Sequence, residues 1–186
     1  MDSRTPDASV ETLRETIYTD QSEWGGWLSV FASQLFTHNT MVALFCFALG
    51  FMVGIPTAIL LAYNGCILGA YVALFYSKGL GYEFVGWLLI HGVTELLAII
   101  LAGAAGIHIG KTLAFPGKMR RVDAMAKAGR MIGNVAMGCV LMLLLAAVLE
   151  GFGRQMINDD TTRYLIAAVS FLGWMSYFYL LPRRAN

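Results

Sequence analysis

The chain has 186 residues, of which 58% are hydrophobic and only 13% are charged. Soluble domains are about half apolar and one quarter charged, so this composition excludes an ordinary soluble domain, an intrinsically disordered chain and a nucleic-acid-binding domain. The formal net charge is +1, so bulk electrostatics does not recruit an acidic partner. The composition predicts an all-α integral membrane protein, built as a polytopic helical bundle of about five transmembrane helices.

Residues 1–38 form the first predicted unit, an extracytoplasmic or interfacial amphipathic segment. This segment holds six of the twelve acidic residues and only two bases. From about Trp24 its apolar residues fall at helical spacing, which is typical of an amphipathic helix at a membrane interface. A surface helix packed on the bundle fits the pattern equally well. Residues 39–186 form the second unit, the transmembrane helical domain.

The transmembrane unit starts with an uncharged run from Asn39 to Tyr76. One span takes about 20 residues, so this run predicts two helices, 39–54 and 57–76, separated at Gly54-Ile55-Pro56. We interpret His38 and Asn39 as the start of the first helix, because Asn is a good N-cap. That helix would be about 24 Å long, short for a full span. A tight hairpin and a partly re-entrant pair both stay open.

Three more helices are predicted, at 84–105, 131–152 and 164–181. The stretch 111–130 between the first two holds six bases against one acid, Asp123. Basic loops stay in the cytoplasm. This loop and the carboxyl terminus are therefore predicted to be cytoplasmic, and segment 1–38 to lie outside a multi-pass bacterial cytoplasmic membrane. Because no signal peptide precedes that segment, we expect an upstream membrane helix to be missing.

Small residues are expected to hold the helices together, because apolar burial does not drive helix association in lipid. Four GxxxG spacings occur, at Gly50/Gly54, Gly65/Gly69, Gly106/Gly110 and Gly129/Gly133. At least one pair is expected to lie in a contact within the bundle, and a homo-oligomer seam stays open. The cysteines lie in apolar runs without partner spacing and are expected to be small buried side chains: Cys46, Cys66 and Cys139.

Ionisable groups inside predicted spans mark the candidate site, because such groups are costly in lipid and normally face a partner or a cavity. His91 and Glu95 lie four residues apart and share one helix face. Glu95 is expected near the membrane midplane, as is Asn64 on the preceding helix. Glu150 lies near the end of the following helix. Together these four residues form the predicted intramembrane polar cluster.

Three interpretations of the cluster compete. In the favoured one, the polar groups hydrogen-bond each other and clamp neighbouring helices together. In the second, they line a path for an ion or small solute, with the polar site at His91, Glu95 and Glu150. In the third, they bind a metal or move protons, but HxxxE lacks the second histidine of the HExxH zinc motif. With no nucleophile set and no phosphate-binding loop, we expect neither enzyme activity nor a bound metal or cofactor.

Several short segments occur in a distinctive order along residues 30–153. They are Leu35–Asn39, Phe47–Gly50, Tyr63–Gly65 with Leu68-Gly69, His91–Leu96, Ala102–Gly106, Pro116-Gly117 and Leu149–Phe152. This series resembles the stage II sporulation protein M family. The His-Gly-x-x-Glu segment followed by a run of small residues is its most specific part. Ile90 departs from the family, whose members often carry proline before the histidine.

The resemblance implies a membrane protein that acts in engulfment of the spore, where it anchors peptidoglycan-degrading partners. In relatives from bacteria that do not sporulate the role is obscure, and longer relatives carry an extra amino-terminal membrane helix. The family positions carried over here, none with a catalytic role, are Asn39, Asn64, Gly65, His91, Gly92, Glu95, Gly106 and Glu150.

We therefore expect a non-catalytic scaffold that positions cell-envelope proteins. Its expected partners are membrane lipids and other envelope membrane proteins, peptidoglycan hydrolases among them, and no nucleic acid. The alternative is a small-solute or ion channel or transporter.

Overall fold

The computed structural model describes residues 4–18, 27–153 and 157–180, except for the side chains of 27–35, 152 and 153. These residues form helices and, within the described ranges, no strand. The elements are α1 (Val10–Glu15), α2 (Trp27–Gly50), α3 (Ile55–Ser77), α4 (Gly81–Ala114), α5 (Arg121–Val148), the π-helical turn η2 (Leu149–Gly153) and α7 (Asp160–Tyr179). The predicted all-α bundle is confirmed.

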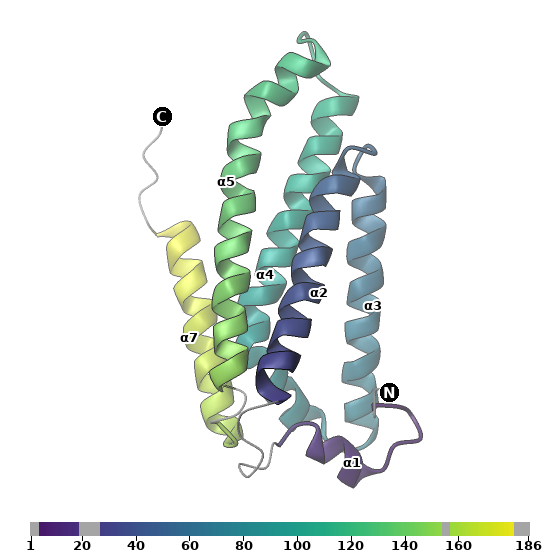
Figure 1. The fold of residues 1–186 in the computed structure, drawn as a ribbon, viewed down its shortest axis with the longest axis vertical. Helices are drawn as coiled ribbons and strands as arrows, with labels where there is room; N and C mark the ends of the chain where they lie inside the picture. The colour runs from purple at the N-terminus through teal and green to yellow at the C-terminus, as the bar shows by residue number, and fades with distance from the viewer. Residues whose placement is uncertain (1–3, 19–26, 154–156, 181–186) are drawn as a thin grey trace.

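The long helices α2, α3, α4, α5 and α7 run up and down in alternation, and short α1 lies across one end (Figure 1). We call this end, which also holds the turn Lys78–Leu80 and Asp159, the α1 end. The opposite end, at Phe115–Arg120, is the α4–α5 turn end. Helix α4 packs against α2, α3, α5 and α7, so the central helix of the bundle is the one that carries His91 and Glu95.

Among the residues that the structure describes, three helical stretches are long and apolar enough to cross a membrane: Ile55–Ser77, Gly81–Ala114 and Arg121–Gly151. The stretch Phe36–Gly50 of α2, the part of this helix whose side chains are described, is apolar but shorter. Large apolar side chains point outward from the bundle, for example Ile59 and Leu165, which suits a surface in contact with lipid. The structure is therefore that of a helical membrane bundle, and spanning by α2 and α7 stays a prediction.

Several helix boundaries differ from the predicted ones, most of all at the start of α2, in the stretch 111–130 and at the start of α7. Helix α2 begins at Trp27, so the interpretation of His38 and Asn39 as a helix start is wrong. Nothing between Trp27 and Asn39 breaks a helix, so it crosses the expected boundary at residue 38. The expected amphipathic pattern begins at Trp24, outside the described residues, and the side chains at 27–35 are not described.

The basic stretch 111–130 is largely helical rather than a loop. Helix α4 continues to Ala114 and α5 begins at Arg121. Lysine, arginine and alanine favour helix, so a high density of charge does not end one. Only the segment around Pro116-Gly117, where Gly117 has a positive φ of 66°, interrupts the helical backbone. Helix α7 also starts earlier than expected, at Asp160, because Asp159 accepts a hydrogen bond from the Thr162 backbone N–H at 2.7 Å.

The predicted break at Gly54-Ile55-Pro56 is confirmed. Helix α2 ends at Gly50 and α3 begins at Ile55 with proline in its first turn. Between them Val53 and Gly54 both adopt left-handed backbone angles, with φ of 63° and 77°. Glycine takes this conformation without a steric cost, and it lets the chain reverse within a few residues. Helices α2 and α3 therefore form a tight hairpin.

Helices α2 and α4 run parallel and meet through glycines. A Cβ on Gly50 would lie 2.8 Å from the Cα of Gly106, and one on Gly110 would lie 2.7 Å from the Val53 carbonyl oxygen. The expectation of a GxxxG contact within the bundle is thus confirmed for Gly50/Gly54 and Gly106/Gly110. The pairs Gly65/Gly69 and Gly129/Gly133 have no such neighbour within 4 Å of an added Cβ.

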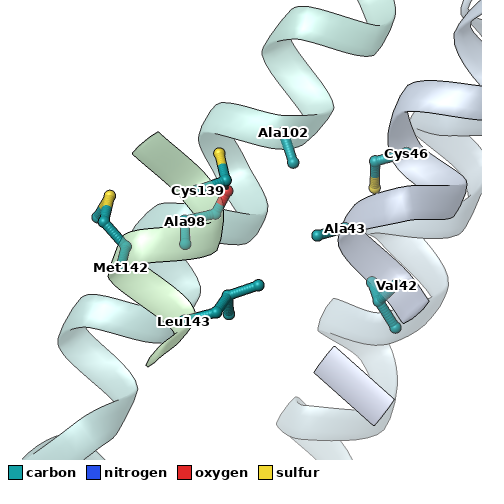
Figure 2. Packing of buried hydrophobic residues seen from close by; sticks show 8 residues of the cluster. All are labelled: Val42, Ala43, Cys46, Ala98, Ala102, Cys139, Met142 and Leu143. Carbon is teal, nitrogen blue, oxygen red and sulfur yellow. Dashed lines mark hydrogen bonds between the residues drawn. The ribbon is translucent and has the colours of Figure 1, made fainter. Parts of the chain in front are cut away.

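The apolar core joins α2, α4 and α5. Figure 2 shows Val42, Ala43 and Cys46 of α2 facing a group that contains Ala98, Ala102, Cys139, Met142 and Leu143. The Cys139 thiol donates a hydrogen bond to the Ala98 carbonyl at 3.3 Å. Burial of Cys46 and Cys139 is as expected, but Cys66 is exposed, so that prediction is wrong for Cys66. Its helix, α3, packs on the bundle along one side only.

Candidate functional site

A cavity of about 430 Å³ lies among α2, α3 and α4, in the half of the bundle nearer the α1 end. Its walls are mainly apolar, with leucine, isoleucine and aromatic side chains along α3 and α4. Its polar lining residues are Arg4, His38, Asn39, Asn64, His91 and Glu95. A mostly apolar cavity with a few polar groups is the usual form of a ligand site, so this cavity is the candidate functional site.

Helix periodicity places the α4 residues of the site. Trp87, His91 and Glu95 follow each other at intervals of four and therefore lie on one face. On α3, Asn64, Leu68 and Tyr71 share a face, because they follow each other at intervals of four and three. The cavity lining includes both His91 and Glu95 on this face of α4, and Asn64 of α3 lines the same cavity.

Glu95 is joined to α2 by a hydrogen bond. The Asn39 side-chain amide donates to Glu95 Oε1, and Asn39 is itself buried. A carboxyl group in a membrane helix is costly unless a polar partner satisfies it. The bond therefore clamps α2 to α4. The sequence pattern did not identify Asn39 as this partner, since the two residues lie 56 positions apart.

Asn64 bonds to its own helix. Its side-chain amide donates to the Leu60 carbonyl at 2.8 Å, a local bond between a residue and the one four positions before it. Asn64 thus lines the cavity opposite α4. The hydrogen bond that the structure shows for the Asn64 amide therefore lies within α3, whereas the sequence predicted a bond to the polar cluster.

His91 belongs to a stack of side chains that leads to the α1 end. Its ring meets the edge of Trp87 with 6.1 Å between ring centroids. The Arg4 guanidinium lies over the same indole, 5.3 Å from the ring centroid. Both His91 and Trp87 are buried. The amino-terminal segment therefore reaches the cavity through Arg4, a residue that no helical pattern singled out.

Glu150 lies apart from the cavity lining. It is buried in η2, which packs against α4 and α2. A π-helical turn places its residues differently from an α-helix, and such turns are frequent at functional sites. In the described part of the chain, no group of three or more His, Cys, Asp and Glu side chains is placed to hold a metal ion.

The α1 end is held closed by Arg163. The guanidinium of this fully buried residue donates to the carbonyls of Ile17 at 3.1 Å and Ile157 at 2.9 Å, and to Asp160 at 3.0 Å. It also lies 4.8 Å from the centroid of the Tyr18 ring. Arg163 precedes the helix predicted at 164–181, but the structure places it inside α7 as a buried residue. It is an interior residue that fastens residues 4–18 to α7.

Two further bonds fasten the same segment. The Tyr18 hydroxyl donates to Asp160 at 2.9 Å, and Lys78 donates to the Ala8 carbonyl at 3.1 Å. Burial raises the pKa of Tyr18 to about 12, and the bond to the Asp160 carboxylate acts in the same direction. Beneath these bonds, Leu13 and Ile17 pack in an apolar cluster at the α1 end.

The fold and the site define a helical membrane protein whose central helix is bonded to its neighbours beside a cavity. The family model described as Stage II sporulation protein M matches residues 4–153. The chain belongs to this family and is a sporulation-related membrane protein. No curated protein and no solved structure matches the chain.

The positions that carry the family resemblance converge in space. Six of the eight line the cavity: Asn39, Asn64, Gly65, His91, Gly92 and Glu95. The other two lie elsewhere on the central packing, since Gly106 meets the α2 backbone and Glu150 lies in η2. The cavity is thus the part of the structure on which these family positions are concentrated.

Proposed function

We propose that the protein is a non-catalytic membrane scaffold that positions other cell-envelope proteins. Membership of the stage II sporulation protein M family supports a sporulation-related membrane protein. The resemblance to this family implies peptidoglycan-degrading enzymes as the partners. The observation that carries the proposal is the Asn39–Glu95 bond, which uses the costly carboxyl of α4 to hold two helices together. A carboxyl group used in this way has a structural role in the bundle rather than a catalytic one.

Contacts at both sides of Glu95 support the same interpretation. The Trp174 indole of α7 donates to Thr94, the residue before Glu95, at 3.0 Å. Toward the α4–α5 turn end, Gly106 and Gly110 bring the α4 backbone against α2 and the turn after it. The cavity lining ends before this contact, at Ile100. Close packing beyond the cavity favours a static clamp over a path for solutes.

The positions of the basic residues predict how the proposed scaffold is oriented in the membrane. Six exposed bases surround the α4–α5 turn end: Lys111, Lys118, Arg120, Arg121, Lys127 and Arg130. Under the positive-inside rule this end lies in the cytoplasm and the α1 end lies outside, in a bacterial cytoplasmic membrane. Because α7 runs from the α1 end, the carboxyl terminus is then cytoplasmic. Arg183 and Arg184, which contribute to this orientation, are outside the described residues.

The exposed side of α1 is the proposed docking surface for extracytoplasmic partners. It presents the charged side chains of Glu11, Arg14 and Glu15, while Leu13 is buried beneath. Wall-degrading enzymes act outside the membrane, so their docking requires a surface at the α1 end. The segment that carries this surface is fastened by Arg163, which gives a partner a rigid platform.

Site-specific photo-crosslinking in native membranes tests the proposal. A photoreactive residue at Glu11 or Glu15 is expected to capture peptidoglycan-degrading enzymes, and the same residue at exposed Lys118 or Lys127 is the matched control. Capture from both ends, or from neither end under conditions where the protein is correctly inserted, would contradict the proposed scaffold. A homo-oligomer would appear in the same experiment as crosslinked copies of this chain.

A further inference from the structure

The cavity among α2, α3 and α4 has the length of a lipid chain. Its lining on α4 extends from Phe84 to Ile100. At 1.5 Å per residue this distance is about 24 Å, longer than one leaflet of a bilayer whose apolar core is about 30 Å thick. The volume of about 430 Å³ holds roughly 14 non-hydrogen atoms, at the ~30 Å³ that a water molecule occupies in the liquid.

The cavity opens to the outside of the bundle between α3 and α4. Gly65, Ile67 and Ile100 line it and are also exposed. A Cβ on Gly65 would meet no atom within 4 Å, so glycine leaves free space at this position. A hydrocarbon chain can therefore enter sideways from the membrane, without passing through either end of the bundle.

The two ends of the cavity differ in polarity. Near the α1 end, Arg4 contributes a guanidinium group beside the Trp87 ring. Arginine binds phosphate through paired hydrogen bonds, and tryptophan is favoured at the level of lipid head groups. Toward Ile100 the lining becomes aliphatic, with Leu61, Leu96 and Ile99. This polarity matches an amphiphile with an anionic head and a single apolar chain in the cavity.

The polar side chains in the middle of the cavity do not prevent an apolar chain from binding. Glu95 accepts the Asn39 amide, and the Asn64 amide donates to Leu60. These groups thus have hydrogen-bond partners inside the protein and do not require water in the cavity.

We propose that this cavity binds one acyl chain of an anionic phospholipid, with its phosphate beside Arg4 and its chain between α3 and α4. The site is independent of the proposed scaffold function, because it needs no protein partner. A free fatty acid also has an anionic head group and one apolar chain, so it is the alternative ligand.

Photolabelling in reconstituted vesicles tests the site. The probe is phosphatidylglycerol with a diazirine in one acyl chain, and the labelled peptides are identified by mass spectrometry. Labelling is expected on the cavity-facing peptides of α3 and α4, around Leu68 and Leu96. Gly65→Leu, which fills the free space, is expected to lower that labelling by roughly tenfold, a loss of about 1.4 kcal/mol in binding.

Gly69→Leu is the matched control, because Gly69 lies on the same helix with equally free space but does not line the cavity. It is expected to leave labelling unchanged. Equal labelling in both variants would mean that bulk lipid alone is detected, and would overturn the proposal. Leu68→Trp provides a second way to fill the cavity if Gly65→Leu fails to fold, and it is expected to lower labelling in the same manner.

The head group is tested with two further probes. Phosphatidylcholine with the same diazirine is expected to label the cavity less than phosphatidylglycerol, and Arg4→Gln is expected to remove that difference. Equal labelling of the unaltered protein by both phospholipids would overturn the proposed head-group contact. If a diazirine fatty acid labelled the cavity and phosphatidylglycerol did not, the proposal that the ligand is a phospholipid would be overturned.

Discussion

The Asn39 amide of α2 donates a hydrogen bond to the Glu95 carboxyl of α4, at the same offset of 56 residues that brings Gly50 of α2 against Gly106 of α4. A constant offset means that the two helices are parallel and in fixed register. The glycines allow the backbones to approach, and the approach places the amide within reach of the carboxyl. Polar bonding and close packing thus depend on each other along one helix pair.

Replacing Glu95 tests the polar bond. Glu95→Gln keeps an acceptor for the Asn39 amide and is expected to lower the free energy of unfolding only slightly. Glu95→Leu leaves the amide buried without that acceptor, which is expected to cost about 1–3 kcal/mol. Unfolding in mixed micelles, followed by circular dichroism, measures both values. Equal destabilisation by the two substitutions would argue against the bond as a clamp.

Replacing Gly106 tests the helix approach. A Cβ there would lie 2.9 Å from the Cys46 carbonyl carbon, so Gly106→Ala must push α2 away. Overpacking of this kind is expected to cost about 1–3 kcal/mol of unfolding free energy. Gly129→Ala is the control, because nothing lies within 4 Å of an added Cβ at that position. If Gly129→Ala were as harmful as Gly106→Ala, the effect would not arise from the contact with α2.

The absence of a transport function is a third prediction. If the cavity ends at the close packing of α2 and α4, vesicles containing the protein should show no more flux of protons, metal ions or small solutes than empty vesicles. EDTA should likewise leave the thermal unfolding midpoint unchanged if no metal is bound. Flux that Glu95→Leu abolishes would instead support the channel or transporter alternative.

The sequence could predict features that depend on one helix at a time. Periodicity alone puts His91 and Glu95 on one face, and Gly54-Ile55-Pro56 marks the break between α2 and α3 through local backbone preferences. The partner of Glu95 could not be found in this way, because it depends on the register of two helices separated by a third. Asn39 also has the character of an N-cap, so its local preference indicated a different role.

Charge was the least informative signal for structure. Arginine rarely lies fully buried, so nothing in the sequence indicates an interior position for Arg163. Its burial depends on the Ile17 carbonyl, 146 residues away in the chain, which no local pattern reveals. The basic stretch 111–130 is a second example. Its charges predict the side of the membrane on which it lies, but they do not determine whether its backbone is helical.

The bonds around Tyr18 predict how the α1 end responds to alkaline pH. The pKa of Tyr18 is raised to about 12 in the folded protein, from an ordinary value of 10.0. Between these two values the folded state therefore holds the proton more tightly than the unfolded state, so stability falls as pH rises from 10 to 12. Below pH 10 both states are protonated and this contribution is constant. Ionisation would also bring a negative phenolate beside the Asp160 carboxylate, so residues 4–18 are expected to detach.

Limited proteolysis of the amino-terminal segment across this pH range measures the detachment, with tyrosinate absorbance recording ionisation in parallel. Tyr18→Phe, which retains the ring over Arg163 but lacks the hydroxyl, is expected to weaken attachment at neutral pH and to remove this pH-dependent part. Arg163→Gln is expected to release the segment at all pH values, because the bond to the Ile17 carbonyl is lost. A pH dependence of detachment that is the same in Tyr18→Phe would show that another group controls the α1 end.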